Sequence, residues 1–423
     1  MTGWKAAVTR LTGLEDPATA VLVLLMIGGG VVLRVQNVGY PFHYGWDEGQ
    51  YVPAAHQFMV GVKDTGECCH PPLSKLLIGV GMLLLGNNPG GWRFAPLCFG
   101  LQSLVLVFLI ARALFDDRRA GWLAAAFMAA DGFYLSYSRA SLPDMILACS
   151  VMWCVLAALS ARGWMGVGAC AVLVGLAFSI KWVALLVILP ACFIILFLRR
   201  APWYTLIAFA LVPVVHLLVW QVGLALIGEP YDVVSVVHAI QERQRLHLGF
   251  VHGTNPAESS WYTWLVMWHP LVIKSATAGG RVRLASSLGN PFLWIAADTC
   301  LLVLPAWAAA AFFNPRWRER WRDWFDSTAT KALAVLGVTW LSMMLLWMTK
   351  RIVTYWYHYL TPWAYALATL GGLVALLDRR RPRLAFAFVL VAFAVAIYYS
   401  PVWAELPLSP AAVRRRLIFP LWW

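Results

Sequence analysis

Charged residues are scarce in this chain: of its 423 residues only 13% are Asp, Glu, Lys or Arg, whereas 61% are hydrophobic. A typical soluble domain is close to half apolar and about a quarter charged. One soluble core could not bury this much apolar surface, so the composition excludes an ordinary water-soluble domain. We therefore expect a protein that crosses a membrane many times.

The chain also lacks the pattern of a nucleic-acid-binding groove, although its net charge is +13. Such a groove needs Lys and Arg interleaved with aromatic residues on a polar face, and no such stripe is present. In membrane proteins, an excess of Lys and Arg in short loops marks the cytoplasmic side, and Trp gathers at the two membrane surfaces. The positive charge and the 24 Trp residues therefore indicate membrane topology, and we expect no nucleic-acid partner.

Cysteine is infrequent and irregularly spaced. Cys68 and Cys69 stand beside His70, with His43 and Glu67 nearby, but this spacing matches no standard zinc pattern. The other cysteines lie in or next to apolar runs and are expected to behave as small hydrophobic residues: Cys98, Cys149, Cys154, Cys170, Cys192 and Cys300. We therefore expect no metal site, with a divalent metal as the less favoured option. Tandem repeats and low-complexity tracts are lacking too, which favours one membrane domain over residues 1–423.

Long apolar runs are abundant. A membrane span needs about 20 apolar residues, with a range of about 17–25. The expected spans are residues 18–38, 92–114, 120–138, 144–161, 164–180, 182–199, 203–226, 292–313, 331–349, 358–377 and 384–400. The run Leu76–Gly86 is too short to span and predicts a re-entrant or interfacial segment. The first run is too long for a cleavable signal peptide and lacks a small-residue cleavage site.

The short loops set the orientation. With eleven spans, four basic clusters fall on one side, which the positive-inside rule makes cytoplasmic. The clusters are Arg112 with Arg118 and Arg119; Arg199 with Arg200; Arg316, Arg318, Arg320 and Arg322; and Arg379, Arg380, Arg381 and Arg383. We therefore expect a multi-pass plasma-membrane protein with a cytoplasmic N-terminus and an external C-terminus. Residues 39–91 and 227–291 become two large external loops.

A polar segment directly follows the first apolar run. In "WDEGQY", Asp47 and Glu48 stand side by side among aromatic residues. A carboxylate held in a partly dry cleft at the membrane surface can accept a proton from a hydroxyl, whereas the alternative is a solvated loop with ordinary acids. In "HPPLSKLL", two prolines fix the chain and hold His70 and Lys75 in place. Lys75 reaches the level of a bound phosphate or contacts only lipid headgroups.

More ionisable residues follow at the external ends of later spans. Arg139 and Asp144 bracket a short turn in "YSRASLPDMIL", and Asp131 lies about two helical turns before Arg139. The same face collects Lys181, Arg351 and His358 on the predicted topology. Ionisable groups at membrane depth are costly and usually functional, although a structural pair between Arg139 and Asp144 is the alternative. Cations beside a carboxylate suit a lipid whose charged group is a phosphate.

Seven of these motifs, in this order, resemble the protein O-mannosyltransferases of the GT-C superfamily. They are the acid pair in "DEGQY", then "HPPLSKLL", "SRASLPDMIL", "SIKWVAL", "SSLGNPFLW", "KRIVTYWYHYLTPW" and "SPVWAELPLS", which together extend from about residue 40 to 410. Residues 227–291 hold no soluble sugar-binding-like insert of the eukaryotic enzymes, which suggests a bacterial-type member. Ser74 stands where the family usually has glycine.

The resemblance implies an all-α GT-C fold and a mechanism. The donor would be a polyprenyl-phosphate hexose, with mannose favoured, and no further cofactor is implied. Asp47 would take the proton from a Ser or Thr hydroxyl of a secreted or membrane protein, and transfer would invert the anomeric carbon. The candidates for stabilising the leaving phosphate are Lys75, Arg139, Lys181 and Arg351. The residues that would orient the site are Glu48, His70, Asp131, Asp144 and His358.

Three other functions were weighed against this one. A related GT-C enzyme would transfer a sugar or aminoarabinose to lipid A, a glycan or another lipid, with the same architecture and base. A transporter would carry paired ions and broken helices near the bilayer midplane, whereas here the charges gather at one face. A glycosidase would use two carboxylates, but nothing in the sequence requires a hydrolytic water. The motifs leave the acceptor, the exact sugar and the prenyl length open.

Overall fold

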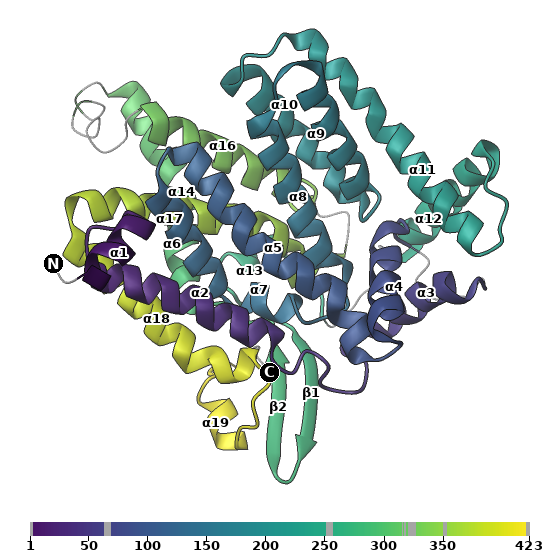
Figure 1. The fold of residues 1–423 in the computed structure, drawn as a ribbon, viewed down its shortest axis with the longest axis horizontal. Helices are drawn as coiled ribbons and strands as arrows, with labels where there is room; N and C mark the ends of the chain where they lie inside the picture. Colours follow the sequence, from purple (N-terminus) through teal and green to yellow (C-terminus); the bar gives the residue numbers. More distant parts are fainter. Residues whose placement is uncertain are drawn as a thin grey trace.

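The computed structural model describes residues 3–62, 69–250, 257–314, 316, 319, 327–349 and 353–419, and it forms a helical bundle with one small β-hairpin (Figure 1). The bundle contains α2 (Pro17–Val35), α5 (Pro89–Phe115), α6 (Arg118–Ala129), α7 (Gly132–Tyr137), α8 (Pro143–Ser160), α9 (Gly163–Phe178), η1 (Trp182–Val187), α10 (Ile188–Phe193), η2 (Ile194–Leu198), η3 (Trp203–Ala210), α11 (Leu211–Leu226), α14 (Pro291–Phe313), α16 (Ser327–Met344), η4 (Trp356–Tyr359), α17 (Leu360–Arg380) and α18 (Pro382–Trp403). The remaining elements are α1 (Gly3–Thr12), α3 (Glu48–Val60), α4 (Leu73–Leu85), α12 (Val233–Phe250), α13 (Trp261–Trp264), β1 (Val272–Ala278), β2 (Arg281–Ser286) and α19 (Pro410–Arg414).

The bundle has the apolar helices of a multi-pass membrane protein. Within the described residues, six helical stretches are long and apolar enough to cross a membrane: 17–35, 89–115, 143–160, 203–226, 356–380 and 382–403. Shorter apolar helices occupy 73–85, 163–178, 182–198, 291–306 and 328–344. The mostly helical, multi-pass architecture is thereby confirmed, while the count of eleven spans stays a prediction. α17 lies at the centre, because it packs against α5, α6, α14, α16 and α18.

Local sequence signals explain where several helices begin. Asp16 accepts from the amide of Thr19 at the start of α2, and Asn88 accepts from two amides at the start of α5. Both helices carry proline at their first position, where no amide partner is needed. α4 starts directly after two prolines and has 13 residues, which is shorter than a membrane span.

The expected continuous helix over 120–138 is wrong in one respect, because the chain breaks between α6 and α7. Asp131 caps α7 by accepting from the Tyr134 amide at 3.0 Å, and its other oxygen accepts from the Asn290 amide at 3.0 Å. Asp131 therefore holds a helix terminus, and Arg139 lies beyond the end of α7. The spacing of the two residues had suggested that both extend from one helix, and this expectation is wrong.

Arg34 satisfies the carbonyl groups that this break leaves open. The last carbonyls of a helix have no partner within it. Arg34, buried on α2, donates to the carbonyls of Met128 at 3.0 Å and Ala129 at 3.3 Å, near the end of α6. An arginine in the first apolar run therefore has a structural role, which the sequence analysis did not identify.

The hairpin of β1 and β2 adds a small sheet to the expected all-α class. The strands pair antiparallel, and Val282 of β2 also bridges to Leu408 beyond α18. In Figure 1 the hairpin extends away from the helices at the bottom of the view, beside α19. It belongs to the second of the two large loops expected outside the membrane.

Ion pairs show that two of the predicted basic clusters meet at one end of the bundle. Arg119 pairs with Glu15 at 2.6 Å, and Arg379 pairs with Asp117 at 2.9 Å. α2 leads from this end to the opposite one, where Arg139 donates to the Leu33 carbonyl at 2.6 Å and pairs with Glu405 at 3.5 Å. Glu15 and Glu405 therefore lie at opposite ends of the bundle.

A reporter fused after Arg200 is expected in the cytoplasm, and reporters near Asn255 or after Trp423 are expected outside the membrane. The reason is that basic short loops are retained on the cytoplasmic side. Alkaline phosphatase and green fluorescent protein fusions measure the two locations. A cytoplasmic C-terminal reporter would contradict this orientation.

Candidate active site

The loop before α3 carries the acid pair, and its two acids face different environments. Asp47 occupies the N-cap position of α3 and is half-buried, whereas Glu48 in the first turn is fully buried. The Trp46 amide donates to the Ile273 carbonyl of β1 at 2.8 Å, which ties the loop to the hairpin. The two adjacent acids of this loop therefore lie in different environments.

Glu48 is held by four hydrogen bonds from three residues. Arg93 of α5 donates to both of its oxygens at 2.8 Å, in the bidentate geometry that makes strong pairs. The amides of Ser141 and Gly45 donate to the same carboxylate at 2.7 and 2.8 Å. Burial alone would raise the pKa of Glu48, but Arg93, Lys274 and the Gly45 amide bring it below its usual value. Glu48 therefore stays ionised and acts on the loop that it anchors.

Arg93 fastens the rest of the same loop. Besides Glu48, its guanidinium donates to three backbone carbonyls, those of Val38, Pro41 and His43, at 3.0–3.2 Å. One buried cation on α5 thus fixes the backbone on both sides of Gly45. The position of Asp47 follows from this anchor.

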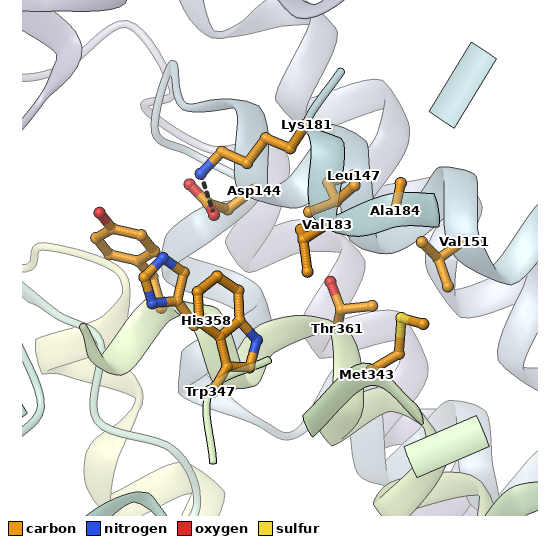
Figure 2. Close-up of a pocket in the computed structure, with 11 residues that line it drawn as sticks. Asp144, Leu147, Val151, Lys181, Val183, Ala184, Met343, Trp347, His358 and Thr361 are labelled. Atoms are coloured by element: carbon orange, nitrogen blue, oxygen red, sulfur yellow. Dashed lines mark hydrogen bonds and ion pairs between the residues drawn. The ribbon is translucent and has the colours of Figure 1, made fainter. Parts of the chain in front are cut away.

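Asp144 and Lys181 form a buried ion pair at the N-terminal ends of α8 and η1 (Figure 2). Lys181 donates to Asp144 at 2.8 Å, and its ammonium lies 5.1 Å from the ring centre of Tyr357. Asp144 sits in the first turn of α8, where the helix dipole favours an acid. The alternative pair between Arg139 and Asp144 is wrong, since Lys181 takes that place.

His358 lies beside this pair on η4. Its Nδ1 accepts from the Tyr355 amide at 3.1 Å, so the neutral ring carries its proton on Nε2. The ring stacks on Trp347 with centroids 3.8 Å apart and planes inclined by 12°. Stacking and capping fix the ring, and Figure 2 shows it near Lys181 and Asp144.

A cavity of about 440 Å³ opens around these residues. One part of its wall is polar or aromatic and is formed by His70, Lys181, Trp182, His247, Trp347, Tyr355, Tyr357 and His358. Another part is aliphatic and is formed by Val183, Leu185, Leu186, Leu346 and Val353. A site with a lysine among polar and aromatic residues in one part of its wall and aliphatic residues in another suits a ligand with an anionic group and a hydrocarbon tail.

His70 separates this cavity from a smaller one of about 40 Å³, which Lys75 and Arg243 also line. Lys75 donates to the His70 carbonyl at 2.8 Å, and Pro71 and Pro72 stand between the two residues in the sequence. Burial, then Lys181, His247 and Lys75, hold the pKa of His70 well below its usual value. His70 is therefore neutral at pH 7.

Asp47 is linked to the large cavity through Tyr357. Tyr137 and Tyr357 both lie within electrostatic range of Asp47 and of Asp144, and their rings are 6.5 Å apart. Tyr357 also lines the cavity. Tyr357 of η4 thus links the acid of the loop before α3 to the wall of the cavity that holds Lys181.

Arg139 takes a different position from the one expected. It is buried, and it donates to the carbonyls of Leu33 and Asn37 besides pairing with Glu405. Its predicted contact with a donor phosphate stays a prediction, and its position favours a structural role. Arg351, a further predicted phosphate ligand, lies outside the described residues.

Several residues of the site were missed by sequence reasoning. Arg93 stands within an apolar run, and an ionisable residue at that depth is itself a signal. Lys274, Glu405 and His247 carry no such signal, because only the fold brings them to the loop and the cavity. Within the described part of the chain, no group of three His, Cys, Asp or Glu residues could hold a metal ion. Cys68 lies outside that part.

Comparisons with known proteins bear on the same segments. Residues 69–220 match the family model described as dolichyl-phosphate-mannose-protein mannosyltransferase. A polyprenol-phosphate-mannose–protein mannosyltransferase of Mycolicibacterium smegmatis is 35% identical over 147 residues, which cover 33% of this chain and 27% of the relative. The match thus spans about a quarter of the length of that relative.

Solved structures extend the likeness to the whole bundle. The Saccharomyces cerevisiae Pmt1-Pmt2 complex bound to the sugar donor aligns with 99% of this chain and 94% of its own, with a TM-score of 0.78 and 10% identity. ArnT from Cupriavidus metallidurans bound to undecaprenyl phosphate aligns with 90% of this chain and 65% of its own, with a TM-score of 0.55 and 17% identity. The chain therefore has the GT-C fold, and the resemblance of its motifs to the protein O-mannosyltransferases is confirmed over residues 69–220.

Proposed function

We propose that the protein is a membrane glycosyltransferase that moves mannose from a polyprenyl phosphate to Ser or Thr hydroxyls of proteins. Transfer takes place at the external membrane face and inverts the anomeric carbon. The observation that carries the proposal is the half-buried Asp47 within electrostatic range of Tyr357, which lines a cavity that combines Lys181 and His358 with an aliphatic wall.

Asp47 is the general base. Its neighbour Glu48 is held by Arg93 in a buried pair, whereas Asp47 is half-buried at the start of α3, and we assign the role of base to Asp47. It takes the proton of the acceptor hydroxyl as the oxygen attacks the anomeric carbon. The bond from that carbon to the phosphate oxygen breaks, and polyprenyl phosphate leaves with both bonding electrons.

Lys181 and His358 receive the charge that develops on the leaving phosphate. Lys181 supplies an ammonium, and His358 has a proton on Nε2 because its Nδ1 accepts from a backbone amide. Donors that are fixed before the reaction stabilise a developing anion without reorganising. Lys75, with Arg351 as a further candidate, adds positive charge on the same side, while Leu185 and Leu346 contact the prenyl chain.

The names of similar proteins agree with this assignment. The mycobacterial relative is a mannosyltransferase that acts on proteins, and two structures of the same fold hold a sugar donor and a polyprenyl phosphate. The acceptor is the least constrained part, since a GT-C enzyme with the same base could glycosylate a lipid or a glycan.

Membranes containing the protein, incubated with labelled polyprenyl-phosphate mannose and a Ser/Thr peptide, test the proposal. We expect the label on the peptide. Label found only in lipid A, a glycan or another lipid would mean that the acceptor is not a protein. Label that stays on the donor would contradict glycosyl transfer.

Lys181→Ala is expected to weaken the donor more than the acceptor. It removes a buried cation from the phosphate position and leaves Asp144 without its partner, so the apparent KM for the donor should rise about 10-fold or more. Steady-state kinetics with each substrate varied measures the difference. Lys331→Ala, which removes an exposed lysine on α16, is the matched control. Equal effects on donor and acceptor would refute the phosphate role.

A further inference from the structure

A second buried charge cluster contacts the Asp47 loop and is formed by Lys274, Glu405 and Arg139. Lys274 of β1 is 3% exposed, and its ammonium donates to the Arg139 carbonyl at 2.6 Å and to Glu405 at 3.3 Å. Glu405, after α18, also pairs with Arg139 at 3.5 Å. Two cations therefore share one carboxylate in a place that the mechanism above does not use.

This cluster touches the catalytic loop directly. The Trp46 amide bonds to the carbonyl of Ile273, and a Cβ placed on Gly45 would overlap both that carbonyl and the Lys274 side chain. Gly45 therefore packs on the stem of Lys274 with no space between them. Asp47 follows two residues later.

The turn after α7 is held by one residue of each buried pair, Lys274 and Glu48. Lys274 donates to the carbonyl of Arg139, while Glu48 accepts from the amide of Ser141 two residues further on. Arg93 and Glu48 thus form one anchor, and Lys274 and Glu405 form the other, with the loop and the turn between them.

We propose that Lys274, oriented by Glu405, is a positioning residue that holds the Asp47 loop in its reactive geometry. The inference rests on the proposed function, because Asp47 is taken as the base. A displacement of about 1 Å in a reacting group can cost up to 100-fold in rate, so a second anchor is consequential. Lys274 acts through the loop and touches no substrate.

The charge of Lys274 makes this positioning role depend on pH. Four charged groups face it: Glu405 after α18, Glu48 on α3, Arg93 on α5 and Arg139 after α7. Burial lowers the pKa of Lys274 to about 8, although Glu405 and Glu48 act to raise it. Above that pH the neutral amine loses its attraction to Glu405, and the anchor weakens.

The test is the dependence of kcat on pH for the wild type and Lys274→Arg. We expect the wild-type kcat to fall above about pH 8, with the acceptor KM little changed, and Lys274→Arg to remain active at about pH 9, since arginine keeps its charge above pH 12. Lys274→Met should lose about 10-fold in kcat at pH 7. Arg281→Met, at the exposed tip of the same hairpin, is the control. Loss of activity at the same pH in the wild type and Lys274→Arg would overturn the proposal.

Deuterium exchange separates this inference from the proposed function. A wild type that transfers no sugar at any pH would refute the function alone. Residues 42–51 should still exchange about 10-fold faster in Lys274→Met than in the wild type, because the loop has lost one anchor. Unchanged exchange there, in protein that is folded, would refute the positioning role whatever the activity.

Discussion

Asp47→Asn is expected to lower turnover by about 10²–10⁴-fold while the protein stays folded and still binds its donor. The amide keeps the size of the side chain but cannot accept the proton of the attacking hydroxyl. Single-turnover transfer with saturating donor measures the chemical step, and donor binding is followed separately. Turnover close to the wild-type value would remove Asp47 from the role of base.

Two variants serve as controls for this result. Asp232→Asn changes an exposed acid just before α12 and should leave turnover unchanged. Glu48→Gln should mainly lower thermal stability, because it weakens a buried pair that anchors the loop. Asp47→Asn is thus expected to lower turnover and Glu48→Gln to lower stability. The opposite result would assign the role of base to Glu48.

Arg93→Ala is expected to destabilise the protein by about 3–5 kcal/mol, the largest stability effect of the changes considered. It leaves the Glu48 carboxylate buried and without its bidentate partner, and it frees three loop carbonyls. The free energy of unfolding in detergent micelles, followed by the loss of helical signal, measures the effect.

The double variant Arg93→Met with Glu48→Gln separates the buried charge from the packing. It removes both charges, so it should cost less than Arg93→Ala alone. Arg379→Ala breaks a pair in which the arginine is 42% exposed, and about 0–1 kcal/mol is expected there. Equal losses in Arg93→Ala and Arg379→Ala would mean that Glu48 is not held as described.

Much of the fold was predictable because apolar length alone places membrane helices. The predicted spans fall on helical segments of the structure from α2 to α18, except that 120–138 is divided between α6 and α7, and the short run after Pro72 forms α4, which is too short to cross. The break at Asp131 was not predictable from hydropathy, since apolar residues stand on both sides of it and the signal is one capping carboxylate. The hairpin was missed because its polar residues alternate weakly over only 13 residues, 272–286 without its turn.

The site was predictable where motifs carry ionisable residues and not where the fold chooses partners. Asp47, Lys181 and His358 were predicted from the sequence. Lys181 and His358 line the large cavity, and Asp47 lies within electrostatic range of Tyr357, which also lines it. Arg139 was expected to bind the donor phosphate, and a pair with Asp144, its neighbour along the chain, was the alternative. The structure pairs Asp144 with Lys181 from another helix and Arg139 with Glu405 near the end of the chain. Such partners depend on tertiary packing, which single-sequence patterns do not encode.

The anomeric configuration of the product tests the central claim most directly. Purified protein would be incubated with polyprenyl-phosphate mannose and a threonine peptide, and the linkage of the sugar on the peptide determined by NMR. A single displacement assisted by Asp47 predicts mannose on the threonine oxygen with the configuration opposite to that of the donor. Mannose with the donor's own configuration, or release of free mannose without glycosylated peptide, would contradict the account.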